Sequence, residues 1–167
     1  TKLVTAYDQP ALGGVYKIAA IRKKDGNWSY KMKLSEQAIK VSNPGIQQVR
    51  RFYNSQEFLG DMIYDEETMP KTNVHTIIDP LDMTRSKTFD SSYQFEDLLV
   101  TVFNKGKSTY QSPNIEDIRK RVQNQLAKFH SGVKRFANPH TYPVGLEENL
   151  FKLKMDLLTK LRKKEQI

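Results

Sequence analysis

The sequence predicts an α+β fold, with antiparallel strands and hairpins in the first two thirds and two packing helices at the C-terminal end. Residues 1–111 contain short strand-like runs separated by turn residues, whereas residues 112–167 contain apolar side chains at helical spacing. Strands that precede helices along a chain are typical of α+β proteins. Because 167 residues fit one ordinary domain, we expect residues 1–167 to form a single segment, with strands and loops in 1–111 and two helices in 112–167.

Two hairpins are predicted in the first part of the chain. Residues 14–22 and 28–34 flank a turn around Gly26, and we expect them to pair. The second of these runs alternates apolar and polar side chains, which indicates a sheet with one covered face and one solvated face. Residues 48–53 and 58–64 predict the second hairpin.

The middle of the chain has weaker patterns. Residues 65–94 are predicted to be irregular, and only residues 74–78 have the character of a strand. A further strand is expected at residues 98–104, which are apolar on both faces and are therefore predicted to lie in a central or well covered position. A turn at residues 105–107 then leads into residues 108–111.

The last third changes to helical periodicity. Ser112 is expected to cap the first helix, with Pro113 at its first position and Gly132 as the residue that ends it. The second helix is predicted from about residue 146 to residue 164, with acidic residues in its first turn and basic residues in its last. The apolar positions are Ile115, Ile118, Val122, Leu126 and Phe129 in the first helix and Leu146, Leu150, Leu153, Leu157 and Leu161 in the second.

The chain is basic, with 27 Lys and Arg against 19 Asp and Glu and a formal net charge of +8. Such a charge attracts polyanions. The basic residues are spread over several predicted elements, which disfavours a nucleic-acid partner. An alternative function, a small basic module that binds nucleic acid or another polyanion, rests on aromatic side chains interleaved with Lys and Arg, because such residues can form a stacking platform. These aromatic residues are Trp28, Tyr30, Phe52 and Tyr53.

The cysteine content and the hydropathy of the chain indicate the cellular compartment in which we expect the protein. The chain has no Cys, which excludes disulfides and favours a reducing environment, so we expect a cytoplasmic protein. No run approaches the roughly 18 consecutive apolar residues of a membrane span, and no membrane partner is expected.

Motifs of catalysis and metal binding are missing from the sequence. It contains no GxGxxG, GxxxxGK[ST], GxSxG or HExxH pattern, so we predict no catalytic residue and no metal site. Several polar residues were weighed for binding, and a structural or solvated role is favoured for each of them. They are His75, His130 and His140 for zinc, Asp61, Asp65, Glu66 and Glu67 for a hard cation, and Arg85 and Lys87 for a phosphate.

A series of short segments, taken in order, carries a resemblance to a known family. They are YDQPALGGVYK at residues 7–17, KLS at 33–35, NPG at 43–45, QVR at 48–50, DPL at 79–81, IR at 118–119, GVKR at 132–135, NPH at 138–140, YPV at 142–144 and LK at 153–154. In this order and spacing the chain resembles bacterial nicotinate phosphoribosyltransferase, over essentially all of its length and in the C-terminal part of the longer family chain. The chain begins at Thr1 without an initiator methionine and with almost no lead-in to its opening loop, so we expect it to be a piece of a longer protein.

The resemblance implies a parent enzyme in which an irregular α/β barrel is joined to an α/β sandwich, usually as a homodimer. It implies that this parent acts in NAD salvage and couples nicotinate to 5-phosphoribosyl pyrophosphate, giving nicotinate mononucleotide and pyrophosphate with the help of Mg and ATP. The family's phosphohistidine, its nicotinate-binding residues and most of its phosphate contacts precede this segment. We therefore expect the segment alone to be inactive, to hold no cofactor and to have the rest of the parent chain as its partner. Among phosphate-binding residues only Thr1 is carried over, as the remnant of a glycine-threonine loop.

Overall fold

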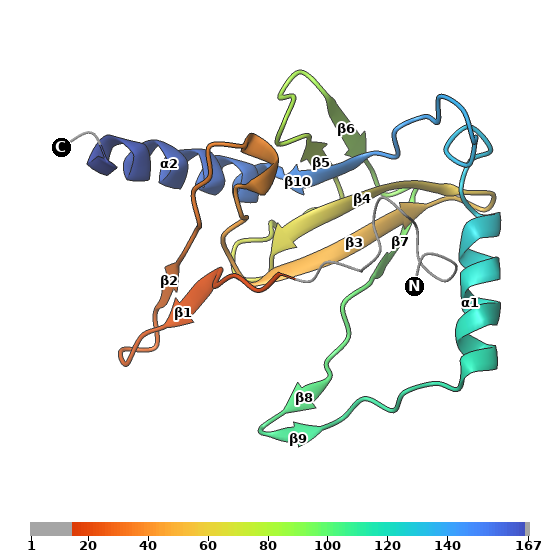
Figure 1. Ribbon diagram of the computed structural model, residues 1–167, viewed down its shortest axis with the longest axis horizontal. Helices are drawn as coiled ribbons and strands as arrows, with labels where there is room; N and C mark the ends of the chain where they lie inside the picture. The colour runs from red at the N-terminus through yellow and green to blue at the C-terminus, as the bar shows by residue number, and fades with distance from the viewer. Residues whose placement is uncertain (1–14, 166–167) are drawn as a thin grey trace, which may run out of the picture.

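A six-stranded sheet forms the centre of the fold in the computed structural model, which describes residues 15–165 (Figure 1). Its strands are β3 (Gln47–Tyr53), β4 (Phe58–Asp65), β5 (His75–Ile78), β6 (Ser86–Phe89), β7 (Gln94–Asp97) and β10 (Val144–Glu147). In space their order is β6-β5-β10-β4-β3-β7, and every neighbouring pair is antiparallel except β10 and β4, which are parallel. The predicted α+β class is confirmed, because two helices follow these mostly antiparallel strands.

Two small hairpins lie outside this sheet (Figure 1). They are formed by β1 (Ala20–Arg22) with β2 (Trp28–Tyr30) and by β8 (Phe103–Asn104) with β9 (Lys107–Ser108). Gly26 and Gly106 occupy their turns with φ of 86° and 77°, a conformation that glycine adopts without steric cost. The hairpin predicted at residues 14–22 and 28–34 is present within the described residues, but each of its strands is only three residues long.

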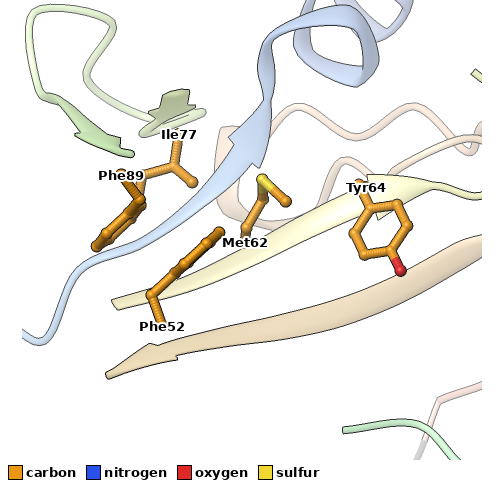
Figure 2. Close-up of a cluster of buried hydrophobic side chains, with 5 residues drawn as sticks. All are labelled: Phe52, Met62, Tyr64, Ile77 and Phe89. Carbon is orange, nitrogen blue, oxygen red and sulfur yellow. The ribbon is translucent and has the colours of Figure 1, made fainter. Parts of the chain in front are cut away.

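The main apolar cluster lies on the sheet and includes side chains from β3, β4, β5 and β6. Its buried members are Phe52, Met62, Tyr64, Ile77 and Phe89 (Figure 2). The rings of Phe52 and Phe89 stack with centroids 4.1 Å apart. Strands β3 and β4, which supply three of the five side chains, are the hairpin predicted at residues 48–53 and 58–64, and that prediction is confirmed.

The region predicted to be irregular is more ordered than expected. Residues 65–94 contain β5, as predicted, but also β6 and the start of β7. The sequences of these two strands, SKTF and QFED, are polar, and the strands form the two edges of the sheet. Edge strands that face solvent lack the alternating apolar pattern on which a sequence-based prediction depends.

The strand predicted at residues 98–104 is wrong. Only Phe103 and Asn104 form a strand, and they belong to the small β8–β9 hairpin rather than to the main sheet. Leu99 and Val100, which were expected to be covered, are more than half exposed. Their apolar character therefore does not reflect burial within the described part of the chain.

The two helices are α1 (Ile115–Ala127) and α2 (Glu148–Glu165). The cap of α1 is Asn114 rather than Ser112, since the Asn114 side chain accepts a hydrogen bond from the backbone N–H of Asp117 at 2.9 Å. The helix ends at Ala127, before Gly132. The second helix starts two residues later than predicted because Leu146 and Glu147 belong to β10.

The helices differ in how they pack. In α2, Leu150 is fully buried and the remaining leucines of the predicted stripe are half-buried, as expected for a helix that packs on the sheet. Glu147 fixes the start of α2, because its carboxylate accepts hydrogen bonds from the backbone N–H groups of Asn149 and Leu150. Helix α1, by contrast, has no buried residue.

Candidate functional site

The most connected polar cluster of the described residues centres on Arg51 of β3. Its guanidinium donates two hydrogen bonds to the Asp61 carboxylate of β4, at 2.9 and 2.7 Å, and a third to the Gln125 side chain of α1 at 2.9 Å. The Tyr142 hydroxyl donates to the same carboxylate at 2.9 Å. The β3–β4 hairpin is thereby joined to two later segments of the chain at one point, which we call the Arg51 cluster.

The charges of the Arg51 cluster interact strongly because they are largely buried. The side chains of Arg51 and Asp61 are only 14 % and 11 % exposed. The hydrogen bonds to Asp61 raise the pKa of Arg51, and burial together with the charge of Asp61 raises the pKa of Tyr142. Tyr142 is therefore a neutral donor and Arg51 a permanent cation. The guanidinium also lies 4.5 Å from the ring centroid of Phe58 in β4. Its hydrogen bonds and this contact join β3, β4 and α1.

Asp65 has a similar joining role. It is fully buried and accepts hydrogen bonds from the Ile46 backbone N–H at 2.7 Å, the Tyr30 hydroxyl at 2.7 Å and the Thr68 hydroxyl at 3.0 Å. Burial and the contact with Asp65 raise the pKa of Tyr30. The contact with Tyr30 attaches the β1–β2 hairpin to the main sheet.

The acidic residues weighed for a cation are thus divided in the structure. Asp61 and Asp65 are engaged in internal contacts, whereas Glu66 and Glu67 are exposed. Among residues 15–163, no group of three or more His, Asp or Glu side chains is gathered in a way that could hold a metal ion.

The histidines are brought together only in part. The rings of His130 and His140 stack with centroids 6.2 Å apart, on either side of Gly132, where an added Cβ would clash with His140. His75 lies in β5 with its ring 6.0 Å from that of Phe52, and burial followed by the charge of Arg50 lowers its pKa. His75 is thus neutral at pH 7 and separate from the other two in the fold.

The two basic residues considered for a phosphate line the same cavity but differ in their contacts. This cavity has a volume of about 420 Å³, and Arg85 and Lys87 lie in its lining with Pro143 and Val144. The Lys87 ammonium donates to the Leu59 carbonyl at 2.8 Å, and burial lowers its pKa. Lys87 is therefore held by the fold, whereas Arg85 is exposed.

The stacking platform of the alternative function is not supported. Phe52 is 1 % exposed in the core, and Tyr30 is tied to Asp65. Trp28 lies beneath the Arg22 guanidinium, 5.7 Å from its ring centroid, within the small hairpin. These aromatic rings do not present a common exposed face to a nucleic acid.

The amino-acid sequence alone does not predict a second polar cluster, because this cluster depends on the pairing of β3 with β7. Arg50 forms a bidentate contact with Asp97, at 2.8 and 3.0 Å, and lies 3.9 Å from the ring centroid of Phe95. Beside it, a cavity of about 630 Å³ extends to His75 and Tyr93. The only available signal was the acidic end of the QFED segment, which is opposite Arg50 in the sheet.

The carried-over residue Thr1 and most of the opening loop at residues 7–17 lie outside the described residues. In the residues that the structure describes, the buried charges of Arg51, Asp61 and Asp65 bind other parts of the same chain. Neither of the two described helices has the length and apolar character of a membrane span. The fold and these contacts define the class of the protein, an α+β domain whose buried charged side chains join its own elements.

Comparison with known proteins gives the particular family. Residues 46–154 match the family model described as the nicotinate phosphoribosyltransferase C-terminal domain. The chain belongs to this family, and the resemblance noted in the sequence is confirmed. A nicotinate phosphoribosyltransferase from Bacillus subtilis is 37 % identical over 166 residues, which are 97 % of this chain and 33 % of the relative. Relatives of the same name from Dictyostelium discoideum and Homo sapiens are 32 % and 30 % identical over 90 % of the chain.

A solved structure supports the fold. The crystal structure of human nicotinic acid phosphoribosyltransferase superposes with a TM-score of 0.60 at 24 % sequence identity, covering 70 % of this chain and 23 % of that one. The chain thus spans about a third or less of the length of the proteins that it matches.

Proposed function

We propose that residues 1–167 are one C-terminal segment of a nicotinate phosphoribosyltransferase. The full-length enzyme would couple nicotinate to 5-phosphoribosyl pyrophosphate and release nicotinate mononucleotide and pyrophosphate, a step of NAD salvage. The observation that carries this proposal is the match over 97 % of the chain to only a third of the Bacillus subtilis enzyme. We further propose a homodimer that works in the cytoplasm, the latter on the ground of the cysteine-free sequence.

The segment contributes framework rather than chemistry. Transfer of a phosphoribosyl group develops positive charge on the sugar and negative charge on the pyrophosphate, so it needs oriented donors and cations around the leaving group. In the described residues the buried cation Arg51 is already paired with Asp61 and bonded to Gln125. This arrangement supports a role in holding β3, β4 and α1 in place for the remainder of the enzyme.

Mg and ATP belong to the proposed full-length enzyme. The described residues do not fit a magnesium site, because the buried carboxylates of Asp61 and Asp65 are saturated by donors from the protein itself. We propose that Thr1 contributes to a phosphate-binding loop when glycines precede it in the longer chain, since such loops depend on converging backbone N–H groups.

The test compares the 167-residue chain with a fusion chain, in which the N-terminal two thirds of the Bacillus subtilis relative precede residues 1–167. Each is supplied with nicotinate, 5-phosphoribosyl pyrophosphate, Mg and ATP, and nicotinate mononucleotide is measured by chromatography. We expect product from the fusion chain and none from the 167-residue chain. Turnover by the short chain alone, or a folded fusion chain without turnover, would contradict the proposal.

A further inference from the structure

Helix α1 presents an apolar stripe to solvent. Ile115, Ile118, Val122 and Leu126 recur on one side of the helix, and their exposed fractions lie between 43 and 59 %. A solvent-facing helix normally places polar residues on such a side. A contiguous exposed apolar surface of this kind is typical of an interaction site.

The segment that precedes α1 has the same character. Residues 98–111, which we call the arm, leave the sheet after β7, form the β8–β9 hairpin and return to α1 (Figure 1). The exposed apolar side chains of the arm, with exposed fractions between 41 and 69 %, are Leu99, Val100, Val102, Phe103 and Tyr110.

The end of the arm and the helix form a groove, which we call the α1 groove. Its volume is about 510 Å³, and its apolar lining comes from Tyr110 of the arm, Pro113 just before the helix, and Ile118, Val122 and Leu126 of α1. The groove is open and shallow rather than enclosed, so it suits a protruding part of a protein better than a small molecule, which binds best in a deep pocket.

The attachment of α1 to the sheet is confined to its C-terminal end. Gln125 accepts the hydrogen bond from Arg51, and just beyond the helix the Phe129 ring packs edge-on against Phe58 with centroids 5.2 Å apart. An isolated helix of thirteen residues is marginally stable in water. The N-terminal turns of α1 therefore need contacts that the described residues do not supply.

We propose that the α1 groove and the arm dock against the N-terminal two thirds of the full-length chain. This inference rests on the proposed function, since the Bacillus subtilis relative has about two thirds of its length outside the match. A second copy of the chain is a poorer occupant of the groove. In a two-fold dimer the same surface of both copies meets, so a groove would face a groove, whereas a groove is filled by a ridge.

Charge at the rim defines the expected counterpart. One basic residue, Arg121, lines the groove, and its side chain is exposed. Arg121 forms no ion pair with another residue in 15–163. The occupant should therefore be an apolar ridge with an acidic residue placed to meet Arg121.

Hydrogen–deuterium exchange tests this docking directly. Backbone exchange is measured on the 167-residue chain and on the fusion chain defined above, at the same pH and temperature. In the fusion chain we expect exchange of peptides from residues 99–110 and 115–126 to slow by about tenfold or more, because docking stabilises them against local opening. Peptides from β3 and β4 serve as the internal reference, since they are already paired in the sheet.

A matched pair of variants in the fusion chain locates the contact. Val122→Glu places a charge in the α1 groove and should abolish the protection of α1. Asn124→Glu adds the same charge on the opposite, exposed side of the helix and should leave the protection intact.

Two results would overturn the inference. One is equal exchange of α1 and the arm in both chains while the fusion chain makes nicotinate mononucleotide, because the proposed function then holds and the docking surface is wrong. The other is protection that appears in the 167-residue chain alone as its concentration rises, which would identify a second copy as the occupant. A fusion chain without turnover counts against the proposed function instead.

Discussion

Replacing Asp61 with Asn probes the Arg51 cluster with almost no change in shape. The substitution removes the charge that receives two hydrogen bonds from Arg51 and one from Tyr142. Arg51 then remains as a cation with little exposure and no charged partner. We expect this change to lower the free energy of unfolding, because an unpaired buried charge is costly.

The magnitude follows from burial. Removing one partner of a fully buried ion pair costs 3–5 kcal/mol in general, and a pair that retains 14 % and 11 % exposure should lose somewhat less, about 2–4 kcal/mol. A urea slope of about 2 kcal/mol per molar converts this loss into a fall of about 1–2 M in the unfolding midpoint.

The assay is urea unfolding followed by circular dichroism at neutral pH, with two graded controls. Asp97→Asn breaks the pair with Arg50, whose carboxylate partner is 35 % exposed, and should cost about 1 kcal/mol. Glu116→Gln breaks an exposed pair with Arg119 and should change the stability by less than about 0.5 kcal/mol.

A double-mutant cycle separates the charge effect from the loss of packing. In an Arg51→Met background no guanidinium is left unpaired, so Asp61→Asn should cost less there than in the native sequence. The reasoning is refuted if Asp61→Asn costs no more than Glu116→Gln, or if its cost is the same in both backgrounds.

Three further changes probe other contacts by the same unfolding assay. Tyr30→Phe removes a hydrogen bond to the Asp65 carboxylate and should cost about 1.5–3 kcal/mol; an unchanged midpoint would contradict the joining role of this contact. The pKa of His75 is lower in the folded state than in the unfolded state, so the unfolded state binds the proton first and the free energy of unfolding falls between about pH 7 and pH 5. His75→Phe should make this fall smaller; an equally steep fall in the variant would contradict the prediction. Gly132→Ala should cost about 1–3 kcal/mol, because the added Cβ would clash with His140, and His140→Ala should relieve most of that cost; an equal cost in both backgrounds would contradict the clash.

The sequence allowed the β3–β4 hairpin to be predicted because β4 is mostly apolar, β3 ends in Phe52 and Tyr53, and the turn between them is polar. Asn54 explains this turn, since its side chain accepts hydrogen bonds from the backbone N–H groups of Gln56 and Glu57 at 2.8 Å. The strand predicted at 98–104 is wrong because these apolar residues are exposed, although their pattern is that of a strand covered by a core of the same chain. If the arm docks against the N-terminal two thirds of the full-length chain, its apolar residues are buried there instead of in the core of this segment.

The Arg51 cluster could not be predicted even with the correct hairpin. A regular register continued from the Tyr53–Phe58 pair would place Arg51 opposite Gly60. The bulge between Phe52 and Tyr53 shifts the register by one residue and places Arg51 opposite Asp61. A pattern of apolar and polar residues does not locate a bulge, so the key ion pair emerges only in three dimensions.

The most direct test of the framework role is a binding titration of the 167-residue chain. Amide signals in ¹⁵N-labelled protein are followed as 5-phosphoribosyl pyrophosphate or nicotinate mononucleotide is added at moderate ionic strength. We expect no saturable shifts, because the buried cations Arg50 and Arg51 are paired within the fold and the proposed phosphate loop lacks its glycines. Saturable shifts that map to one site, with a dissociation constant below about 1 mM, would show that this segment carries a substrate site of its own.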